Sequence, residues 1–149
     1  MRLVVQRVDK ASVSVNNQVI SSIGAGLLVF LGIEKGDTAG NADLMLEKTI
    51  NLRIFEDREG KMNLSLLDVA GGLLVVSQFT LLGDCWKGKR PSFIRAEDPG
   101  PAKALYEYFM KKAAEKVACA AGGEFQAMMK VALVNDGPVT MLLDSRKQF

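Results

Sequence analysis

The alternation of apolar and polar positions predicts strands in the first third of the chain. Residues 3–8 and 12–15 fit half-buried strands, and Asn16-Asn17 supplies a turn into a returning strand at 18–23. After a glycine-rich break, the unbroken apolar run 27–33 predicts a continuous apolar strand at the centre of the sheet. This part of the chain therefore favours a sheet built from a hairpin and a buried strand.

The rest of the chain alternates between helical and extended patterns. Apolar spacing predicts a helix over 41–51, short strands at 52–56 and 61–64, and the strongest strand at 73–81. A long polar connection, 83–100, precedes a helix that begins near Asp98 and Pro101, ends near 121 and carries an apolar stripe including Leu105, Tyr108 and Phe109. Strands at 125–133 and 139–143 complete the pattern.

These elements predict one α+β domain over residues 1–149. About eight strands and two helices, with the helices interrupting the strands, favour a mainly antiparallel curved sheet or β-barrel-like core with two main outer helices. The length suits a single domain, and 48% hydrophobic residues provide for a core.

Composition limits the partners and the cellular compartment that we expect for this chain. The net charge of +2 is too small to indicate a nucleic-acid partner by itself. Cys85 and Cys119 form no CxxC pair, and although their spacing does not rule out a disulfide between them, we expect reduced thiols in a cytoplasmic protein. The longest apolar stretch, 24–33, is shorter than the roughly 20 residues of a spanning helix, so we expect no membrane partner.

The absence of histidine restricts the chemistry more sharply. It removes the Ser-His-Asp triad, the Cys-His dyad and histidine-based metal sites, and no GxxxxGK[ST] loop is present for a nucleotide. We therefore expect no metal site and no cofactor. Cys85 as a nucleophile would lack both a base and an orienting partner.

Ser77, Gln78, Phe79 and Thr80 form the first candidate site. The apolar run before them demands burial, so these residues should stand at the exit of a buried strand, with Ser77 and Phe79 on one face and Gln78 and Thr80 on the other. Their polar groups must be hydrogen-bonded or used. Bonds to neighbouring strands would satisfy them without any function, and the residues alone leave both interpretations open.

The string Asn135-Asp136-Gly137-Pro138-Val139-Thr140 is the second candidate site. Its composition favours a hairpin turn between two apolar runs. A cis Gly137-Pro138 bond would direct two successive carbonyl oxygens the same way, as a rigid wall, although only about 5–6% of X-Pro bonds in folded proteins are cis.

Lys87, Lys89 and Arg90 lie in the long polar connection with Trp86 and Phe93. Cations mixed with aromatics on a glycine-broken loop fit phosphate contact and base stacking. An ordinary solvated loop explains the same composition.

These motifs resemble the D-aminoacyl-tRNA deacylases of the bacterial and eukaryotic type, the D-tyrosyl-tRNA deacylase family, over nearly the whole chain. Besides SQFTL (77–81) and NxGPVT (135–140), the matching segments are 5–8, 11–13, 24–28, 61–63, 90–93 and 104–106. The two strings are specific together, whereas either alone would be weak. No motif position departs from the family's pattern.

The resemblance implies a homodimer of β-barrel-like subunits with active sites shared across subunits and aminoacyl-tRNA as the partner. It implies hydrolysis of the ester that joins a D-amino acid to the terminal adenosine of tRNA, hydrolysis of glycine on tRNA, and refusal of L-amino acids. In the family, Gly137-Pro138 would be a cis pair that enters the partner's pocket, where its carbonyls face the substrate Cα on the side of an L side chain. Arg7 would help to hold that pair.

Without histidine, positioning and oxyanion stabilisation must supply most of the catalysis. Backbone N–H groups around Phe79 and Thr80 are the candidate donors, and the neighbouring ribose hydroxyl of the RNA could activate water. An alternative mechanism makes the Thr80 hydroxyl a nucleophile, but the chain offers no base to ionise it. Rival functions are a non-catalytic tRNA-binding module and a deacylase that edits L-alanine, a type with a trans Gly-Pro and another pattern in place of SQFTL.

Overall fold

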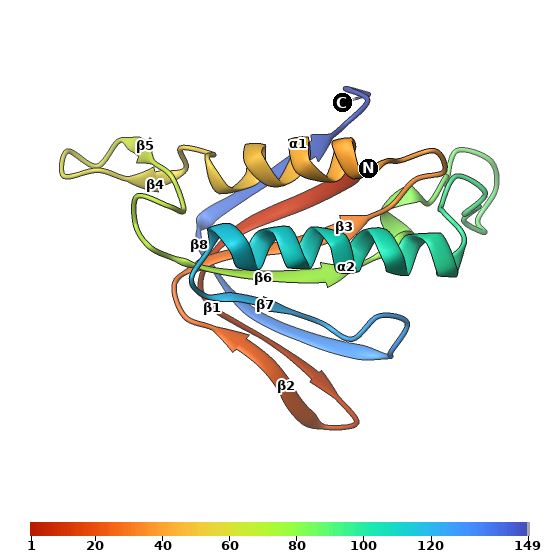
Figure 1. Cartoon of the computed structure of the whole chain (residues 1–149), viewed down its shortest axis with the longest axis horizontal. Helices are drawn as coiled ribbons and strands as arrows, with labels where there is room; N and C mark the ends of the chain where they lie inside the picture. Colours follow the sequence, from red (N-terminus) through yellow and green to blue (C-terminus); the bar gives the residue numbers. More distant parts are fainter. Residues whose placement is uncertain (149) are drawn as a thin grey trace.

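Strand β1 organises the sheet in the computed structural model, which describes residues 1–148 (Figure 1). Along the chain the elements are β1 (Arg2–Val15), β2 (Gln18–Ile23), β3 (Gly26–Gly32), α1 (Ala39–Ile50), β4 (Phe55–Glu56), β5 (Met62–Leu64), β6 (Gly72–Ser77), the 3₁₀ helix η1 (Phe79–Leu82), α2 (Pro99–Lys116), β7 (Ala120–Gly122) and β8 (Met129–Asp144). One edge of β1 pairs antiparallel with β3 and then β2, and the other edge pairs antiparallel with β8.

The strand order β2-β1-β3-β6-β7 makes a mixed sheet, because β6 pairs parallel with both β3 and β7. Parallel neighbours need a crossover, and α1 lies in the crossover from β3 to β6 while α2 lies in the one from β6 to β7. The sheet curls until β2 also contacts β6 and β7, which nearly closes a barrel. The predicted α+β class with a barrel-like core and two outer helices is confirmed; the β3–β6 and β6–β7 pairings within the sheet are parallel, whereas the pairings of β1 are antiparallel.

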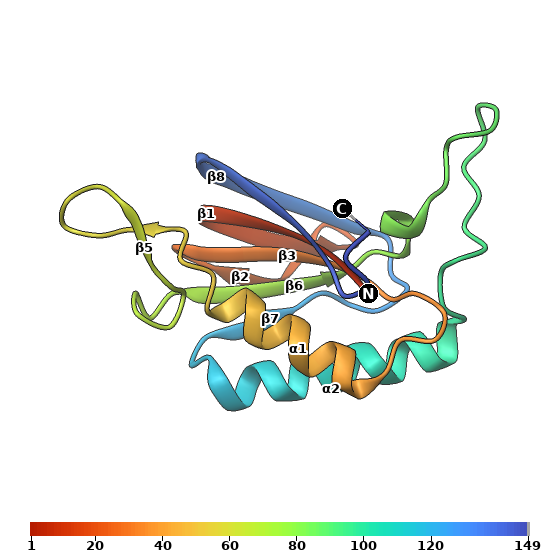
Figure 2. The same ribbon diagram turned by 90° about the horizontal axis from the view of Figure 1, so that it is seen from above.

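Both helices cover the same face of the sheet (Figure 2). Helix α2 buries Ala102, Tyr106, Phe109 and Ala113, a spacing of three to four residues that keeps one stripe against the sheet. Helix α1 begins with a capping box between Thr38 and Asn41. The apolar layer between helices and sheet is the larger core, and a second cluster fills the inside of the curl.

Strand β6 is buried on both faces and joins these two clusters. Leu73 and Val75 belong to the layer beneath the helices, whereas Leu74 and Val76 belong to the cluster inside the curl. The glycine at the start of β3 permits close pairing, because a Cβ on Gly26 would lie 2.0 Å from the Gly72 carbonyl oxygen. The unbroken apolar pattern of β3 and β6 follows from this position.

Several details of the predicted elements were wrong, and the strands predicted separately at 3–8 and 12–15 form the single strand β1. The strand predicted over 73–81 ends at Ser77, and η1 replaces the alternation expected for 77–80. The second long helix ends at Lys116, before the strand β7 that pairs with β6. Strand β8 is one element where two were expected, and residues 124–128 lie outside it. The buried stripe of α2 includes Tyr106 rather than Tyr108, which is half-buried.

No helix within residues 1–148 combines the length and the apolar character needed to cross a bilayer.

Candidate active site

A cavity of about 920 Å³ opens where β6 leaves the sheet. Its walls come from the ends of β3 and β6, the start of α2 and the segment that leads into β8, and its apolar lining includes Phe30, Val76, Ala102, Phe125, Met129 and Val131. Ser77, Gln78, Phe79 and Thr80 all line it. We call this space the site cavity. Its size and mostly apolar wall with few polar groups are typical of small-molecule sites.

The four residues 77–80 pass from a buried strand to an exposed turn. The Gln78 backbone N–H donates to the Leu31 carbonyl oxygen at 2.8 Å, which extends the β3–β6 contact by one residue. Ser77 and Gln78 are half-buried, whereas Phe79 and Thr80 are exposed. Across residues 1–148, the Ser77, Gln78 and Thr80 side chains make no hydrogen bond to protein, which leaves their polar groups open to the cavity.

Backbone N–H groups also stand at this edge of the cavity. Phe79 and Thr80 are the first two residues of η1, where N–H groups have no acceptor within the helix. Gln78 accepts from the Leu81 N–H at 3.3 Å, and Thr80 accepts from the Gly83 N–H at 3.0 Å. The turn is therefore held by its carbonyl groups, while the N–H groups of Phe79 and Thr80 donate no hydrogen bond within residues 1–148.

Residues 83–98, which we call the arm, project from the body of the molecule (Figure 2). The Asp84 and Ser92 backbones exchange two hydrogen bonds, of 2.8 and 2.9 Å, which close the arm into a narrow loop. Beyond this pair, Lys87, Lys89 and Arg90 are exposed. At its base, Phe93 lines the site cavity. The arm thus joins the candidate cationic residues to the candidate catalytic segment.

The segment 135–140 is a bulge inside β8 rather than the predicted turn between two strands. The two-residue step from Gln6 to Val8 on β1 lies opposite the five-residue step from Asn135 to Thr140 on β8. The extra residues leave the ladder, and Gly137 and Pro138 are exposed, joined by a cis peptide bond. In Figure 2, β8 bends sharply near its middle.

Arg7 supports this bulge from β1, where its side chain is buried. Its Nε donates to the Asp136 carbonyl oxygen at 3.1 Å and lies 3.0 Å from an Asp136 carboxylate oxygen, and its Nη1 donates to the Ile54 carbonyl oxygen at 2.6 Å. Asn135 spans the bulge, since its side-chain oxygen accepts the Val139 N–H at 2.8 Å. Two side chains therefore hold the backbone on either side of Gly137.

The sequence pattern of a family described as D-Tyr-tRNA(Tyr) deacylase matches residues 4–144. The chain belongs to this family. It is 65% identical over 149 residues to a D-aminoacyl-tRNA deacylase of Syntrophus aciditrophicus and 58% identical over 149 residues to one of Kosmotoga olearia, with all of each chain covered. The suspected family is confirmed.

Solved structures share the fold. One titled c-Myc DNA Unwinding Element Binding Protein has a TM-score of 0.92 at 41% identity, covering 97% of this chain and 98% of that one. A probable eukaryotic D-amino acid tRNA deacylase has a TM-score of 0.81 at 18% identity, covering 95% of this chain and 97% of that one, and shows the fold alone.

Within one chain of this deacylase family, the two sequence strings do not meet. Residues 77–80 line the site cavity, whereas Arg7, Gly137 and Pro138 are absent from its lining. The paired strands explain the separation: Ser77 lies opposite Leu31 near one end of β3, while Arg7 lies opposite Leu27 near the other. The structure therefore contains two candidate sites on one chain.

Sequence reasoning missed most of the cavity wall. Phe125 precedes β8 and Met129 is its first residue, and nothing in their local pattern distinguishes them from ordinary core residues. Gln126, between them, has a φ of +63°, an uncommon value for a residue other than glycine. In the described part of the chain, no three His, Cys, Asp or Glu side chains are grouped so as to hold a metal ion. Both cysteines are free and exposed.

Proposed function

We propose that this chain hydrolyses the ester bond of D-aminoacyl-tRNA and releases free D-amino acid and tRNA. The observation that carries the proposal is the opening of Ser77–Thr80 onto the site cavity, in a chain that belongs to the D-Tyr-tRNA(Tyr) deacylase family. The cavity volume of about 920 Å³ lies within the range of small-molecule sites and can receive an adenosine carrying an amino acid.

The proposed chemistry relies on backbone donors and on the substrate's own hydroxyl. Water attacks the ester carbonyl, and the N–H groups of Phe79 and Thr80 stabilise the oxyanion that forms. The adjacent ribose hydroxyl of the terminal adenosine assists removal of the water proton. The carbonyl–oxygen bond to the ribose then breaks, and that ribose oxygen takes up a proton. The chain has no histidine to perform these transfers.

The alternative, in which Thr80 forms an acyl-enzyme, is less well supported by the geometry. Its hydroxyl has no hydrogen-bonded base among residues 1–148. A threonine hydroxyl that acts as a nucleophile needs such a base.

Chiral selection is proposed to come from Gly137 and Pro138 acting in the cavity of a partner copy. Both residues are exposed and lie outside the cavity of their own chain, which supports a role across a homodimer. Their carbonyls would occupy the space that an L side chain needs, so the wrong hand is refused by collision. Glycine lacks a side chain, so glycyl-tRNA would also be accepted. Arg7 holds the bulge that carries the pair.

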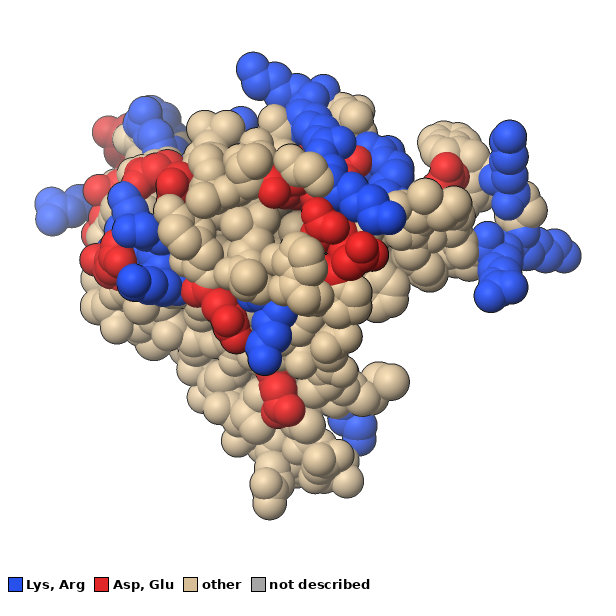
Figure 3. All heavy atoms as spheres, turned by 45° about the vertical axis from the view of Figure 1, so that its right-hand side comes forward, with Lys and Arg blue, Asp and Glu red and all other residues tan. Residues whose placement is uncertain are grey.

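Lys87, Lys89 and Arg90 are proposed to contact tRNA phosphates from the arm. All three are exposed, and Lys and Arg atoms gather at the projecting end of the molecule (Figure 3). Reversing their charge should weaken tRNA binding and reduce its dependence on salt, because fewer counterions are released. We propose that the enzyme works in the cytoplasm, because aminoacyl-tRNA is used in that compartment.

The deciding assay offers D-aminoacyl-, glycyl- and L-aminoacyl-tRNA in parallel to the purified chain. We expect release from the first two and not from the third. Retention of every aminoacyl group despite tRNA binding would instead indicate a binding module, and release of L-alanine would indicate the L-alanine-editing type. Equal release from both hands would contradict chiral selection.

Mixed dimers test the sharing of the site. Thr80→Trp should block the cavity, and Gly137→Ala should disturb the bulge. If the bulge acts in the partner's cavity, a dimer of one variant with the other retains one intact site, and activity returns to about a quarter of wild type in an equal mixture. If it acts in its own cavity, the mixture stays inactive.

A further inference from the structure

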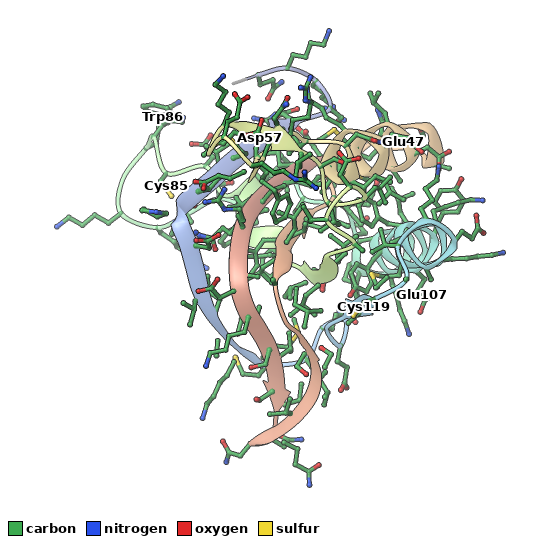
Figure 4. The ribbon with its side chains drawn as sticks, turned by 90° about the vertical axis from the view of Figure 1, so that its left-hand side faces the viewer. Glu47, Asp57, Cys85, Trp86, Glu107 and Cys119 are labelled. Atoms are coloured by element: carbon green, nitrogen blue, oxygen red, sulfur yellow. The ribbon has the colours of Figure 1, made fainter. Side chains whose placement is uncertain are left out.

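Trp86 is a large apolar side chain that the fold places in solvent. Its exposed fraction is 93%, and it is the only tryptophan of the chain. Figure 4 shows it out on the arm, away from the sheet. A single exposed apolar residue is common, but an indole in this position presents both faces of its ring to an incoming group.

The backbone that carries Trp86 is held in place. Its N–H donates to an Asp84 carboxylate oxygen at 2.9 Å, next to the paired Asp84 and Ser92 backbones. The root of the arm is fixed to the segment that follows β3: the Lys35 N–H donates to the Arg95 carbonyl at 2.9 Å, and a buried Glu34 carboxylate lies 2.6 Å from the Arg95 guanidinium. The ring is therefore presented from a supported position.

The charges around Trp86 favour a polyanion. Lys87, Lys89 and Arg90 follow it within four residues, and none of the three has a salt bridge or hydrogen bond to residues 1–148. The nearby carboxylate of Asp84 is turned to the Trp86 N–H instead. Aromatic rings beside unpaired cations are a combination by which proteins bind single-stranded nucleic acid, with bases on the rings and phosphates on the cations.

The arm also sets where such a strand would lie. Phe93 lines the site cavity, and Trp86 is two residues beyond Asp84, the partner of Ser92. Because two residues span at most about 7 Å, the Trp86 backbone lies within that distance of Asp84. A strand whose last ribose enters the cavity would therefore pass the indole with its preceding nucleotides.

We propose that Trp86 stacks on a base of the single-stranded 3′ end of tRNA, just before the terminal adenosine. This inference rests on the proposed function and adds a base-stacking contact outside the cavity. Stacking needs only a base face, so the contact would serve tRNAs of different sequence.

The sole tryptophan makes the proposal directly measurable. The full chain is titrated with a hairpin RNA that carries an unpaired 3′ CCA end and with the same hairpin made blunt, while indole fluorescence and affinity are recorded. Trp86→Ala is compared with Trp86→Phe, which keeps an aromatic face. D-aminoacyl-adenosine, which lacks the preceding nucleotides, serves as a small substrate for all three proteins.

We expect the CCA-ended hairpin to quench the indole and to bind Trp86→Ala about five- to a hundredfold more weakly, with Trp86→Phe within about threefold of wild type. Unchanged fluorescence at saturating RNA, or equal loss of affinity for the blunt hairpin, would overturn the proposal and leave the indole to a protein partner or to duplex contact.

The small substrate distinguishes a failure of base stacking by Trp86 from a failure of the proposed hydrolysis. If all three proteins hydrolyse D-aminoacyl-adenosine at the same rate while RNA leaves the indole fluorescence unchanged, the proposed stacking is wrong and the proposed function stands. If wild type hydrolyses neither the small substrate nor D-aminoacyl-tRNA, the proposed function itself fails.

Discussion

The ring of Phe93, on the arm, packs edge-on against the ring of Phe79, at the mouth of the site cavity, with centroids 5.1 Å apart and planes 72° apart. Phe93 also lies over Gly83, where a Cβ would come within 3.0 Å of its ring. Phe79 contributes one of the backbone N–H groups proposed to hold the oxyanion. The arm that would bind tRNA is therefore packed directly against the segment that would perform the chemistry.

Replacing Phe93 by alanine should loosen that segment. Edge-on aromatic pairs contribute about 0.5–1.5 kcal/mol beyond buried area, and we expect kcat for D-aminoacyl-tRNA to fall about three- to tenfold. Ile94→Ala is the matched control, because Ile94 is the next residue and 78% exposed. Steady-state kinetics check the prediction, and similar kcat values for the two variants would contradict it.

Gly137→Ala should distort the bulge for two reasons: the backbone conformation there is unfavourable for alanine, and the added Cβ collides with Val139. Gly137 has a φ of +132°, and an added Cβ would lie 2.7 Å from Val139 Cγ2 and 2.9 Å from the Val139 nitrogen. We expect a loss of about 1–3 kcal/mol in the free energy of unfolding, together with loss of D-deacylation. Denaturant unfolding and the D/L assay measure the two effects.

Gly88→Ala is the matched control, because it introduces the backbone strain of a positive φ without a steric collision. Gly88 has a φ of +73°, but an added Cβ would meet nothing within 4 Å. This variant should lose less stability and keep its chiral preference. If Gly137→Ala were fully active and as stable as wild type, the bulge could not have the role proposed for it.

The two strings show how far sequence reasoning reaches. The polar exit of a buried strand at Ser77 was predictable, because a strand with an unbroken apolar run must end before polar side chains meet solvent. The turn into η1 was not, since Phe79 and Thr80 favour an extended strand by propensity. Likewise the composition of 135–138 indicates a turn, and only pairing with β1 on both sides makes it a bulge.

Long-range pairing explains the other differences. Ala120 and Ala121 continue a helical composition, yet they belong to β7 because β6 offers a free edge. The site cavity brings together residues from β3, β6, α2 and the segment before β8. Each wall residue has an ordinary apolar pattern of its own, so the wall exists only once the sheet has curled.

Tyr106 predicts a pH dependence of stability. It is buried, its hydroxyl donates to the Val75 carbonyl at 2.9 Å, and burial raises its pKa to about 12. In the unfolded chain the tyrosine ionises at about pH 10. The stability that depends on the neutral phenol is therefore complete below that pH and is lost as pH rises toward 12. The loss should reach about 2–3 kcal/mol.

Tyr106→Phe removes this titration at the cost of one hydrogen bond. At neutral pH the variant should be less stable by about 1 kcal/mol. Between pH 10 and 12 its free energy of unfolding should fall less steeply than that of wild type. Denaturant unfolding across this interval tests the difference, and parallel curves for the two proteins would refute it.

Thr80→Ala distinguishes the two mechanisms. The exposed hydroxyl has no base within residues 1–148, so its removal should leave deacylation measurable, within about tenfold of wild type. Single-turnover hydrolysis of D-aminoacyl-tRNA gives the rate. Abolished chemistry with unchanged tRNA affinity would instead favour the acyl-enzyme.

The ribose of the terminal adenosine should matter more than Thr80. If its 2′ hydroxyl activates the water, a 2′-deoxy terminal adenosine that carries the D-amino acid on its 3′ oxygen should react about 10²–10⁴-fold more slowly, the usual contribution of a positioned acid or base. Binding should change little, because the cavity wall and the arm are intact. An unaltered single-turnover rate with the deoxy substrate would contradict activation of the water by the ribose hydroxyl, which the proposal invokes because the chain has no histidine.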